Sequence, residues 1–186
     1  MSHPSPKTIL TISGQLGSGK STVAKLLAQK LGYEYYSTGT AHRAIAEKRG
    51  ISTLELNRQA MTDDSIDREV DSQYGTLDNS GKNYVVDSRL AYHFLPHSIK
   101  IKLNVDPDVA GNRIFNDTKR TQEQPYKTAA EATQGMLGRR ALEVARWKKI
   151  YGTDIDDPKN FDDIIDTTNK TPEQTANLII QKFHLK

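Results

Sequence analysis

The sequence predicts an α/β protein in which a mostly parallel β-sheet is covered by helices on both faces. Three observations lead to this prediction. Short β-rich segments alternate with helical stretches, a glycine-rich motif joins the first strand to the first helix, and capping signals mark where later helices begin. The expected strands are residues 8–13, 33–37, 83–87, 99–105 and 161–166.

The first helix is expected to begin inside the glycine-rich motif. Val23, Leu26, Leu27 and Leu31 form an apolar stripe at helical spacing, and Gly32 follows where a helix stop is expected. Later helices are predicted from capping boxes, in which a Ser or Thr is followed three residues later by Glu or Gln. Ser52 with Glu55 opens a polar helical region that runs towards Tyr74. Thr128 with Glu131 opens a helix that reaches about Tyr151, and Thr171 with Gln174 opens the last helix. Asp106-Pro107 similarly ends a strand and opens a helix.

The chain of 186 residues is expected to form one domain. Residues 39–80 and 114–128 are poorer in apolar periodicity than the rest of the chain. We interpret the first of these segments as a substrate-binding flap and the second as a lid. Both leave a core formed by residues 8–38, 81–113 and 129–186.

The composition excludes several kinds of protein. No apolar run is long enough to span a membrane, and residues 1–7 are interpreted as a flexible tail rather than a signal peptide. The 26 basic and 23 acidic residues leave a net charge of +3, which is too small to indicate a nucleic-acid binder. The absence of cysteine fits a reducing cytosol. We therefore expect a cytoplasmic protein with neither nucleic acid nor membrane as partner. We also expect a monomer, although no feature of the composition indicates the oligomeric state.

Residues 14–21 match the P-loop pattern, a glycine-rich sequence that ends in Gly-Lys-Ser. The motif follows an apolar strand and opens an amphipathic helix, which is the structural context that it requires. Its glycines let backbone N–H groups turn towards phosphate oxygens, and the helix N-terminus adds a partial positive charge. The residues expected to bind ATP are Gly14, Gln15, Leu16, Gly17, Ser18, Gly19, Lys20, Ser21 and Thr22.

Lys20, Ser21 and Asp87 are the candidates for the chemistry of phosphoryl transfer. Lys20 is expected to reach the β- and γ-phosphates, and the Ser21 hydroxyl is expected to bind Mg²⁺. Asp87 ends the apolar run 84–86, where P-loop proteins usually have an acidic residue beside the metal. An Asp that merely caps the following helix is the alternative. We expect ATP and Mg²⁺ as cofactors, with Lys20 and Asp87 catalytic and with Ser21 and Asp87 at the metal.

Two arginines follow predicted strands. Arg43 comes after residues 37–39, and Arg89 lies two residues past Asp87. Loops at the carboxyl ends of parallel strands are where ligands bind in this architecture, and guanidinium groups pair bidentately with phosphate. The two arginines therefore predict a second phosphate site beside the P-loop.

Arg139, Glu143 and Arg146 lie at positions i, i+4 and i+7 of one predicted helix and so share one face. One interpretation is an exposed salt-bridge ladder, which would contribute little to stability. The other is a clamp on the transferred phosphoryl group, with Arg139 and Arg146 as catalytic residues. Spacing alone slightly favours the ladder.

Taken together, these residues resemble the cytidylate kinases, especially the short archaeal-type branch of the P-loop nucleoside monophosphate kinases. The similarity covers nearly the whole chain, from residue 8 to about residue 180. In residues 147–157, Trp-Lys-Lys-Ile-Tyr-Gly-Thr-Asp-Ile-Asp-Asp resembles the family's Tyr-Lys-Glu-Ile-Tyr-Gly-Ile-Asp-Ile-Asp-Asp. The other blocks that carry the resemblance are residues 37–43, 66–71, 86–91 and 165–168.

The resemblance implies transfer of the γ-phosphate of ATP to CMP or dCMP. It also implies a P-loop NTPase fold of three α/β/α layers, with five parallel strands in the order 2-3-1-4-5, an NMP-binding flap and a lid. Arg43 and Arg89 would hold the phosphate of the acceptor. Arg139 and Arg146 would neutralise the phosphates and Glu143 would help to hold the acceptor, which favours the clamp over the ladder.

Further acceptor contacts are expected from the segment after the second strand and from the flap. Ser37 and Thr38 belong to the block that contains Arg43. The polar candidates for reading the base are Arg58, Asp67, Arg68 and Asp71. Two departures from the family pattern also lie on the acceptor side: Ser88 stands where a glycine is usual, and His42 stands where an aromatic residue is expected.

Other functions are compatible with part of this pattern. A P-loop kinase for another small acceptor, of adenylate type or non-nucleotide, would share most of these features. A regulatory GTPase should carry Asn-Lys-x-Asp, whereas the only Asn-Lys pair, residues 169–170, is followed by Thr-Pro. A non-catalytic nucleotide-binding regulatory protein is disfavoured by the intact Lys20, Ser21 and Asp87.

Overall fold

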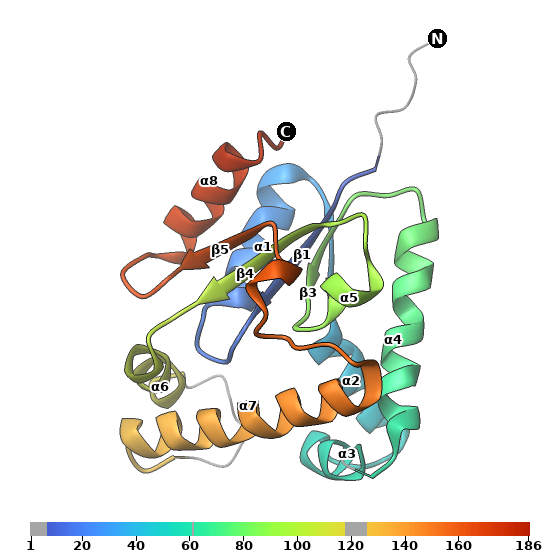
Figure 1. Cartoon of the computed structure of the whole chain (residues 1–186), viewed down its shortest axis with the longest axis vertical. Coiled ribbons are helices and arrows are strands. Elements are labelled where there is room, and N and C mark those ends of the chain that lie inside the picture. The colour runs from blue at the N-terminus through green and yellow to red at the C-terminus, as the bar shows by residue number, and fades with distance from the viewer. Residues whose placement is uncertain (1–6, 61, 118–125) are drawn as a thin grey trace.

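The computed structural model describes residues 7–60, 62–117 and 126–186 (Figure 1). Five parallel strands form one sheet in the order β2-β3-β1-β4-β5, which confirms the predicted fold class and strand order. The strands are β1 (Ile9–Gly14), β2 (Glu34–Ser37), β3 (Tyr84–Asp87), β4 (Ile99–Asn104) and β5 (Asp163–Asp166). The helices are α1 (Lys20–Leu31), α2 (Thr38–Lys48), α3 (Thr53–Gln59), α4 (Asp64–Asn79), α5 (Ala91–Phe94), α6 (Pro107–Phe115), α7 (Ala129–Tyr151) and α8 (Pro172–Lys182), with a 3₁₀ turn, η1 (Pro158–Asn160).

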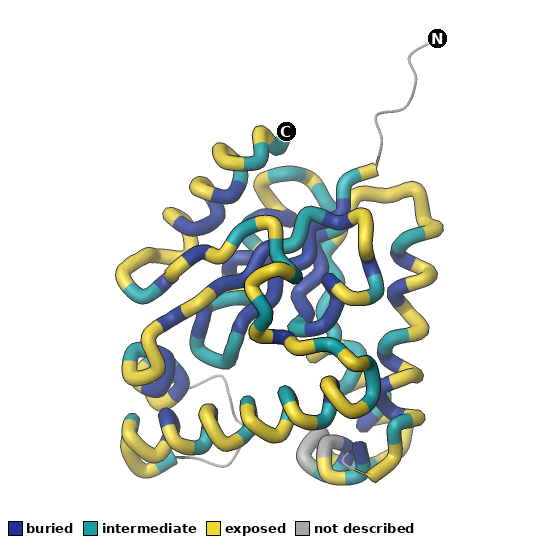
Figure 2. Tube along the Cα trace, in the orientation of Figure 1, coloured by how far each residue is buried: buried dark blue, intermediate teal, exposed yellow. Residues whose placement is uncertain are grey.

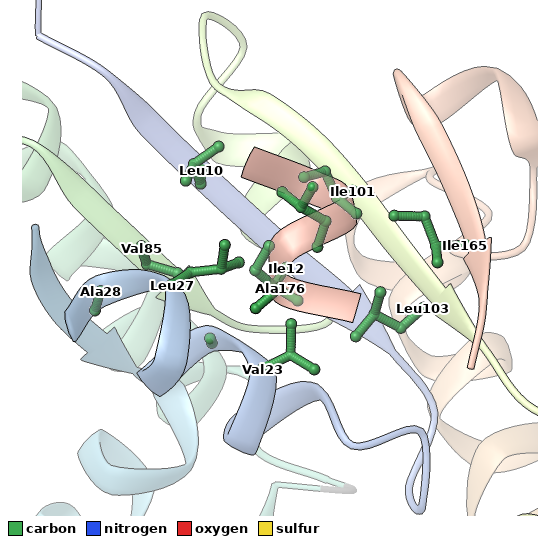
Figure 3. Packing of buried hydrophobic residues seen from close by; sticks show 12 residues of the cluster. Leu10, Ile12, Val23, Leu27, Ala28, Val85, Ile101, Leu103, Ile165 and Ala176 are labelled. Atoms are coloured by element: carbon green, nitrogen blue, oxygen red, sulfur yellow. The ribbon is translucent and has the colours of Figure 1, made fainter. Parts of the chain in front are cut away.

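One face of the sheet packs against α1 and α8. Leu10 and Ile12 of β1 point to this face, because successive side chains of a strand point to opposite sides. Figure 3 shows them beside Val23 and Leu27 of α1 and Ala176 of α8. This cluster fixes the start of α1, and with it the P-loop, relative to the sheet.

The opposite face packs against α4 and α5. Ile9 of β1 and Val86 of β3 point this way and join Tyr74 and Leu77 of α4 and Leu95 in one apolar cluster. Figure 2 shows that buried residues concentrate in the sheet, whereas the outer sides of α4, α7 and α8 are exposed. The expectation of helices on both faces is therefore confirmed.

The single helical region predicted from Ser52 towards Tyr74 is wrong, because it consists of two helices. The Ser52 hydroxyl does cap α3 by accepting from the N–H of Glu55, as the capping signal predicts. A second cap follows, in which Asp63 accepts from the N–H of Ser65 and opens α4. The sequence interpretation also named neither α2 nor α5.

Residues 39–80 are poor in apolar periodicity overall, yet α4 has an inward apolar stripe at helical spacing. Its members are Ile66, Val70, Tyr74 and Leu77, all buried. The polar residues between them hide the stripe in a simple count of apolar content. The carboxyl-terminal half of α4 is thereby part of the packing against the sheet.

The helix α7 packs tightly against α6 at its N-terminal end. A Cβ atom at Gly111 of α6 would lie 2.9 Å from the carbonyl oxygen of Ala129, so a larger residue would force the helices apart. From there α7 runs along the edge of the molecule to α2 and α3 (Figure 1). Residues 118–125 of the predicted lid lie outside the described part of the chain. None of the described helices is long and apolar enough to cross a membrane.

Ser88 lies at the position where the family pattern predicts glycine. It follows β3, and its side chain contacts α4. Its side chain is buried, and its hydroxyl lies 2.7 Å from the hydroxyl of Tyr74 and accepts from the N–H of Leu90 at 3.2 Å. Among the described non-glycine residues, only His184 has a positive φ, so the backbone of Ser88 needs no glycine. The serine thus adds a buried polar contact without strain.

We expect Ser88→Ala to lower the free energy of unfolding by about 1–3 kcal/mol, because the buried Tyr74 hydroxyl loses this partner. In the Ser88→Ala protein, Tyr74→Phe should lower the free energy of unfolding by less than it does in the wild type, because the hydroxyl that it removes has already lost this partner. Urea unfolding of the wild type, both single variants and the double variant gives the coupling energy. If the losses of the two single variants add up to the loss of the double variant, the two hydroxyls do not interact.

Candidate active site

The P-loop is held close to two neighbouring elements. Gly14 has a φ of 151°, and a Cβ there would lie 2.6 Å from the carbonyl oxygen of Leu103 in β4. Gly17 has a φ of 77°, and a Cβ there would lie 2.7 Å from the carbonyl oxygen of Ala110 in α6. Both positions require glycine for conformation and for space, which keeps the loop wrapped tightly at the start of α1.

A cavity of about 350 Å³ opens over this loop. All predicted nucleotide-binding residues from 15 to 22 line it, and Gly14 lies behind them against β4. The remaining lining residues come from other parts of the chain: Val23, Arg89, Arg113, Ile114, Asp117, Thr167, Lys170, Pro172 and Thr175. A concave site of this size, lined by a P-loop, suits a nucleoside triphosphate.

Arg113 is a cavity residue that the sequence analysis missed. Its guanidinium donates to the carbonyl oxygens of Gly17 at 3.2 Å, Thr167 at 2.8 Å and Thr168 at 3.2 Å. The Thr167 hydroxyl in turn donates to the carbonyl oxygen of Ser18 at 3.0 Å. These bonds join the P-loop to α6 and to the end of β5. The block 165–168 pointed to this strand end, but no motif marks Arg113.

Lys20 and Asp87 form a buried ion pair at the centre of the site. The Tyr35 hydroxyl donates to the other Asp87 oxygen at 2.9 Å. Burial opposes ionisation of Asp87, but the Lys20 charge and hydrogen bonds from Lys20, Ser21 and Tyr35 outweigh it, so the pKa of Asp87 lies below its usual range. The two predicted metal ligands, Ser21 and Asp87, are therefore adjacent and Asp87 is a carboxylate.

Glu143 connects α7 to the loop after β3. Arg89 Nη1 lies 2.6 Å from Glu143 Oε1, and Arg139 Nε lies 3.0 Å from the same oxygen. Burial opposes ionisation of Glu143, but the charges of Arg89, Arg139 and Arg146 outweigh it and lower its pKa. The helix face is therefore not merely an exposed ladder, because its carboxylate reaches an arginine that lines the nucleotide cavity.

Arg146 and Asp67 form a second link, between α7 and α4. Arg146 Nη2 lies 3.4 Å from Asp67 Oδ1, and the two side chains are only 15% and 6% exposed. One turn along α4, Asp71 accepts a hydrogen bond from the hydroxyl of Tyr151 at the end of α7. These contacts link α7 to α4 and pair Arg146 with Asp67 rather than with a residue of the P-loop.

The remaining predicted acceptor residues are placed differently. Ser37 and Thr38 lie at the carboxyl end of β2, where the Thr38 hydroxyl donates to the carbonyl oxygen of Asp87 at 3.5 Å. Arg43 Nη2 donates to the Thr40 hydroxyl at 2.9 Å on the exposed side of α2. Arg58 has a 73% exposed side chain paired with Glu55 of its own helix, and its role in binding stays a prediction.

Asp71 makes the stability dependent on pH. Burial raises its pKa to about 6, with the hydrogen bond from Tyr151 opposing the shift and the Asp67 charge adding to it. Because this pKa lies above the unfolded value of about 4, the stabilisation from protonated Asp71 is complete below about pH 4 and is lost as the pH rises through about 6.

We therefore expect Asp71→Asn to raise the free energy of unfolding by about 1–2 kcal/mol above pH 7 and to change it little near pH 4. The amide cannot ionise and still offers an oxygen to Tyr151. Urea unfolding of both proteins at the two pH values measures the difference. An equal difference at both values would show that Asp71 does not titrate in this range.

Comparison with known proteins shows the family of the chain. The chain is 31% identical over 172 residues to the cytidylate kinase of Methanobrevibacter smithii, covering 92% of this chain and 96% of that protein. It is 37% identical over 171 residues to the cytidylate kinase of Aeropyrum pernix, covering 91% and 95%. It is also 33% identical to part of an S-adenosylmethionine-dependent nucleotide dehydratase of Lacinutrix mariniflava, with 95% of this chain spanning only 36% of that protein.

Solved structures with the same fold include an uncharacterized protein from Eubacterium ventriosum, with a TM-score of 0.70 and 18% identity over 97% of this chain and 100% of that one. A shikimate kinase from Bacteroides thetaiotaomicron has a TM-score of 0.66 and 18% identity over 96% and 99%. At this identity they show the fold alone. The model of the cytidylate kinase-like family matches residues 9–169, so this chain belongs to that family.

Proposed function

We propose that the protein is a nucleoside monophosphate kinase that transfers the γ-phosphate of ATP to CMP or dCMP. The observation that carries the proposal is the position of Arg89, which lines the P-loop cavity and also pairs with Glu143 of α7. One cationic side chain thus lies at the boundary between the donor site and the acceptor side. A phosphoryl-transfer enzyme needs such a boundary, because donor and acceptor phosphates must meet there.

On the donor side, the backbone N–H groups of the P-loop and the N-terminus of α1 would hold the triphosphate of ATP. Lys20, now paired with Asp87, would contact the β- and γ-phosphate oxygens. The Ser21 hydroxyl and the Asp87 carboxylate are oxygen donors side by side, and they fit Mg²⁺, which prefers oxygen ligands and keeps several waters. When bound, the ion would neutralise charge on the phosphate oxygens.

On the acceptor side, Arg43 and Arg89 would bind the phosphate of the monophosphate, and Glu143 would hold the acceptor between Arg89 and Arg139. An oxygen of the acceptor phosphate attacks the γ-phosphorus as the bond to the β–γ bridging oxygen breaks, giving ADP and the nucleoside diphosphate. The acceptor oxygen is already anionic, so no histidine or other general base is required. The residues align the phosphates and neutralise their charge.

The proposal includes a cytoplasmic location, which the absence of cysteine supports, and a monomeric state with no nucleic-acid or membrane partner. It also includes the division into a core, a flap of residues 39–80 and a lid of residues 114–128. The helices α2 and α3 and the start of α4 support the flap, because they form their own apolar cluster around Ala46, Leu56 and Ile66.

We expect CMP or dCMP to exceed AMP, GMP and UMP in kcat/KM by about tenfold or more, since a mismatched base leaves buried polar groups unpaired. Coupled detection of ADP formation with ATP and Mg²⁺ measures this. A preference for AMP would replace the cytidylate proposal with another monophosphate kinase. No turnover with any monophosphate would leave only nucleotide binding.

Arg43→Ala should lower kcat/KM for all acceptors by a similar factor, about 100-fold, because the phosphate is common to all of them. Its effect on the KM of ATP should be small. Arg49→Ala, which removes a surface ion pair with Glu69, is the matched control and should change neither parameter. A selective loss with one base would contradict a phosphate-binding role for Arg43.

Lys20→Ala should reduce kcat by at least about 100-fold through lost stabilisation of the transferring phosphate. It should also lower the melting temperature by roughly 6–20 °C, because the buried Asp87 carboxylate loses its cation. Lys30→Ala, which breaks an exposed pair with Glu173, serves as the control. Activity within about tenfold of the parent would exclude the role assigned to Lys20.

A further inference from the structure

Several buried polar atoms gather on the acceptor side of the molecule. Among the residues that the structure describes, six buried side-chain nitrogen or oxygen atoms have no hydrogen-bond partner. Four of the six belong to Tyr36 (Oη), His42 (Nδ1), Asp67 (Oδ2) and Arg146 (Nε), which come from β2, α2, α4 and α7. Buried polar groups are almost always paired in a folded protein, so unpaired ones in one region mark where a ligand supplies the partners.

The four side chains are connected to one another. Arg146 and Asp67 form the 3.4 Å ion pair. In α2, Ala46 lies one turn beyond His42 and shares an apolar cluster with Ile66, the neighbour of Asp67 in α4. The ring of Tyr36 in β2 meets the ring of Tyr74 in α4 edge to face, with 6.3 Å between the ring centroids. The charge of Arg146 also acts on His42. The unpaired atoms are therefore members of one group between α2, α4 and α7.

His42 is the member of this group that the family pattern does not predict, since an aromatic residue is expected before Arg43. Burial lowers its pKa, and the charges of Arg146, Arg139 and Arg89 lower it further, with Glu143 opposing them. The ring is therefore neutral near pH 7, with one nitrogen as donor and the other as acceptor. A neutral imidazole does not add to the positive charge that surrounds it.

The chemistry of the group indicates which part of an acceptor it meets. A phosphate would be repelled by the Asp67 carboxylate, and Arg146 is already paired with that carboxylate. Asp67 Oδ2 accepts, Arg146 Nε donates, and His42 Nδ1 does one or the other. A neutral ring that carries both donors and acceptors satisfies all three, and the amino group, ring nitrogen and carbonyl oxygen of cytosine provide them.

We propose that His42 contacts the nucleobase of the acceptor and helps to select it, beside the Asp67–Arg146 pair. This inference rests on the proposed function, because it assumes that the acceptor is a nucleotide. In this arrangement Arg43 and Arg89 bind the phosphate of the acceptor, and His42, the residue directly before Arg43, contacts the base. Selection of the base would then differ in this chain from that in relatives with an aromatic residue at this position.

The first test observes the ring of His42 directly by NMR of the wild-type protein labelled with ¹⁵N-histidine, with the signal assigned through His42→Asn. CMP should shift the His42 ring signals, cytidine should shift them in the same direction at higher concentration, and ribose 5-phosphate should not. Ribose 5-phosphate has the sugar and the phosphate but no base. If it reproduces the effect of CMP, or if CMP leaves the signals unmoved, the inference is wrong.

The second test is kinetic and compares His42→Leu with His42→Asn. The leucine variant should lose about 10- to 100-fold in kcat/KM for CMP and less for AMP, so that the preference shrinks, while the KM for ATP is unchanged. The asparagine variant keeps a polar atom near the position of Nδ1 and should retain more of the preference. His97→Leu, at an exposed histidine after α5, is the control. Equal losses for CMP and AMP would overturn the inference.

The two tests separate this inference from the proposed function. If no monophosphate is phosphorylated but CMP still shifts the His42 signals, the kinase proposal fails and the contact with the base stands. If CMP is phosphorylated and the signals do not move, the kinase proposal stands and the contact fails. The NMR titration uses the wild type, and either His42→Asn or His42→Leu assigns the His42 signal by removing it, so one variant that folds is sufficient.

Discussion

The buried ion pair between Lys20 and Asp87 is the interaction on which the arrangement of the site depends. Lys20 begins α1, which follows β1 after the P-loop residues 15–19. Asp87 ends β3, which is parallel to β1 with Ile12 opposite Asp87. Ser37 of β2 lies opposite Asp87 on the other side. A shift of one residue in this register would turn the carboxylate to the other face of the sheet. The register therefore aligns the P-loop, the acidic residue and the start of α2 at one edge.

A second constraint is the length and direction of α7. Its first turns pack against α6 beside the P-loop, and its last residue bonds Asp71 of α4. Between these ends, Glu143 pairs with Arg89 and Arg146 pairs with Asp67. One rigid helix thus carries charges to both sides of the site, so a movement of α7 would change donor and acceptor contacts together. Such coupling suits an enzyme that must close around two substrates before it transfers a phosphate.

Two departures from the family pattern have different physical consequences. Ser88 is accommodated by the fold, because its hydroxyl finds Tyr74 and its backbone has no positive φ. His42 is not accommodated in this way, because its Nδ1 is buried without a partner. A polar atom that the fold leaves unpaired costs stability, and such a cost is commonly kept where a ligand later forms the bond.

The sequence by itself determined the fold class, and the family resemblance gave the strand order. It also marked the P-loop residues that line the cavity. These features depend on local patterns: strand alternation, capping residues and the spacing of the P-loop. The tertiary structure alone decided which partners Arg139, Glu143 and Arg146 have, since one helix face is compatible with either an exposed ladder or a buried network. It also decided that Arg113 lines the cavity and that Arg58 points to solvent. Contacts between residues far apart in the chain depend on packing, and packing leaves no signal at a fixed spacing.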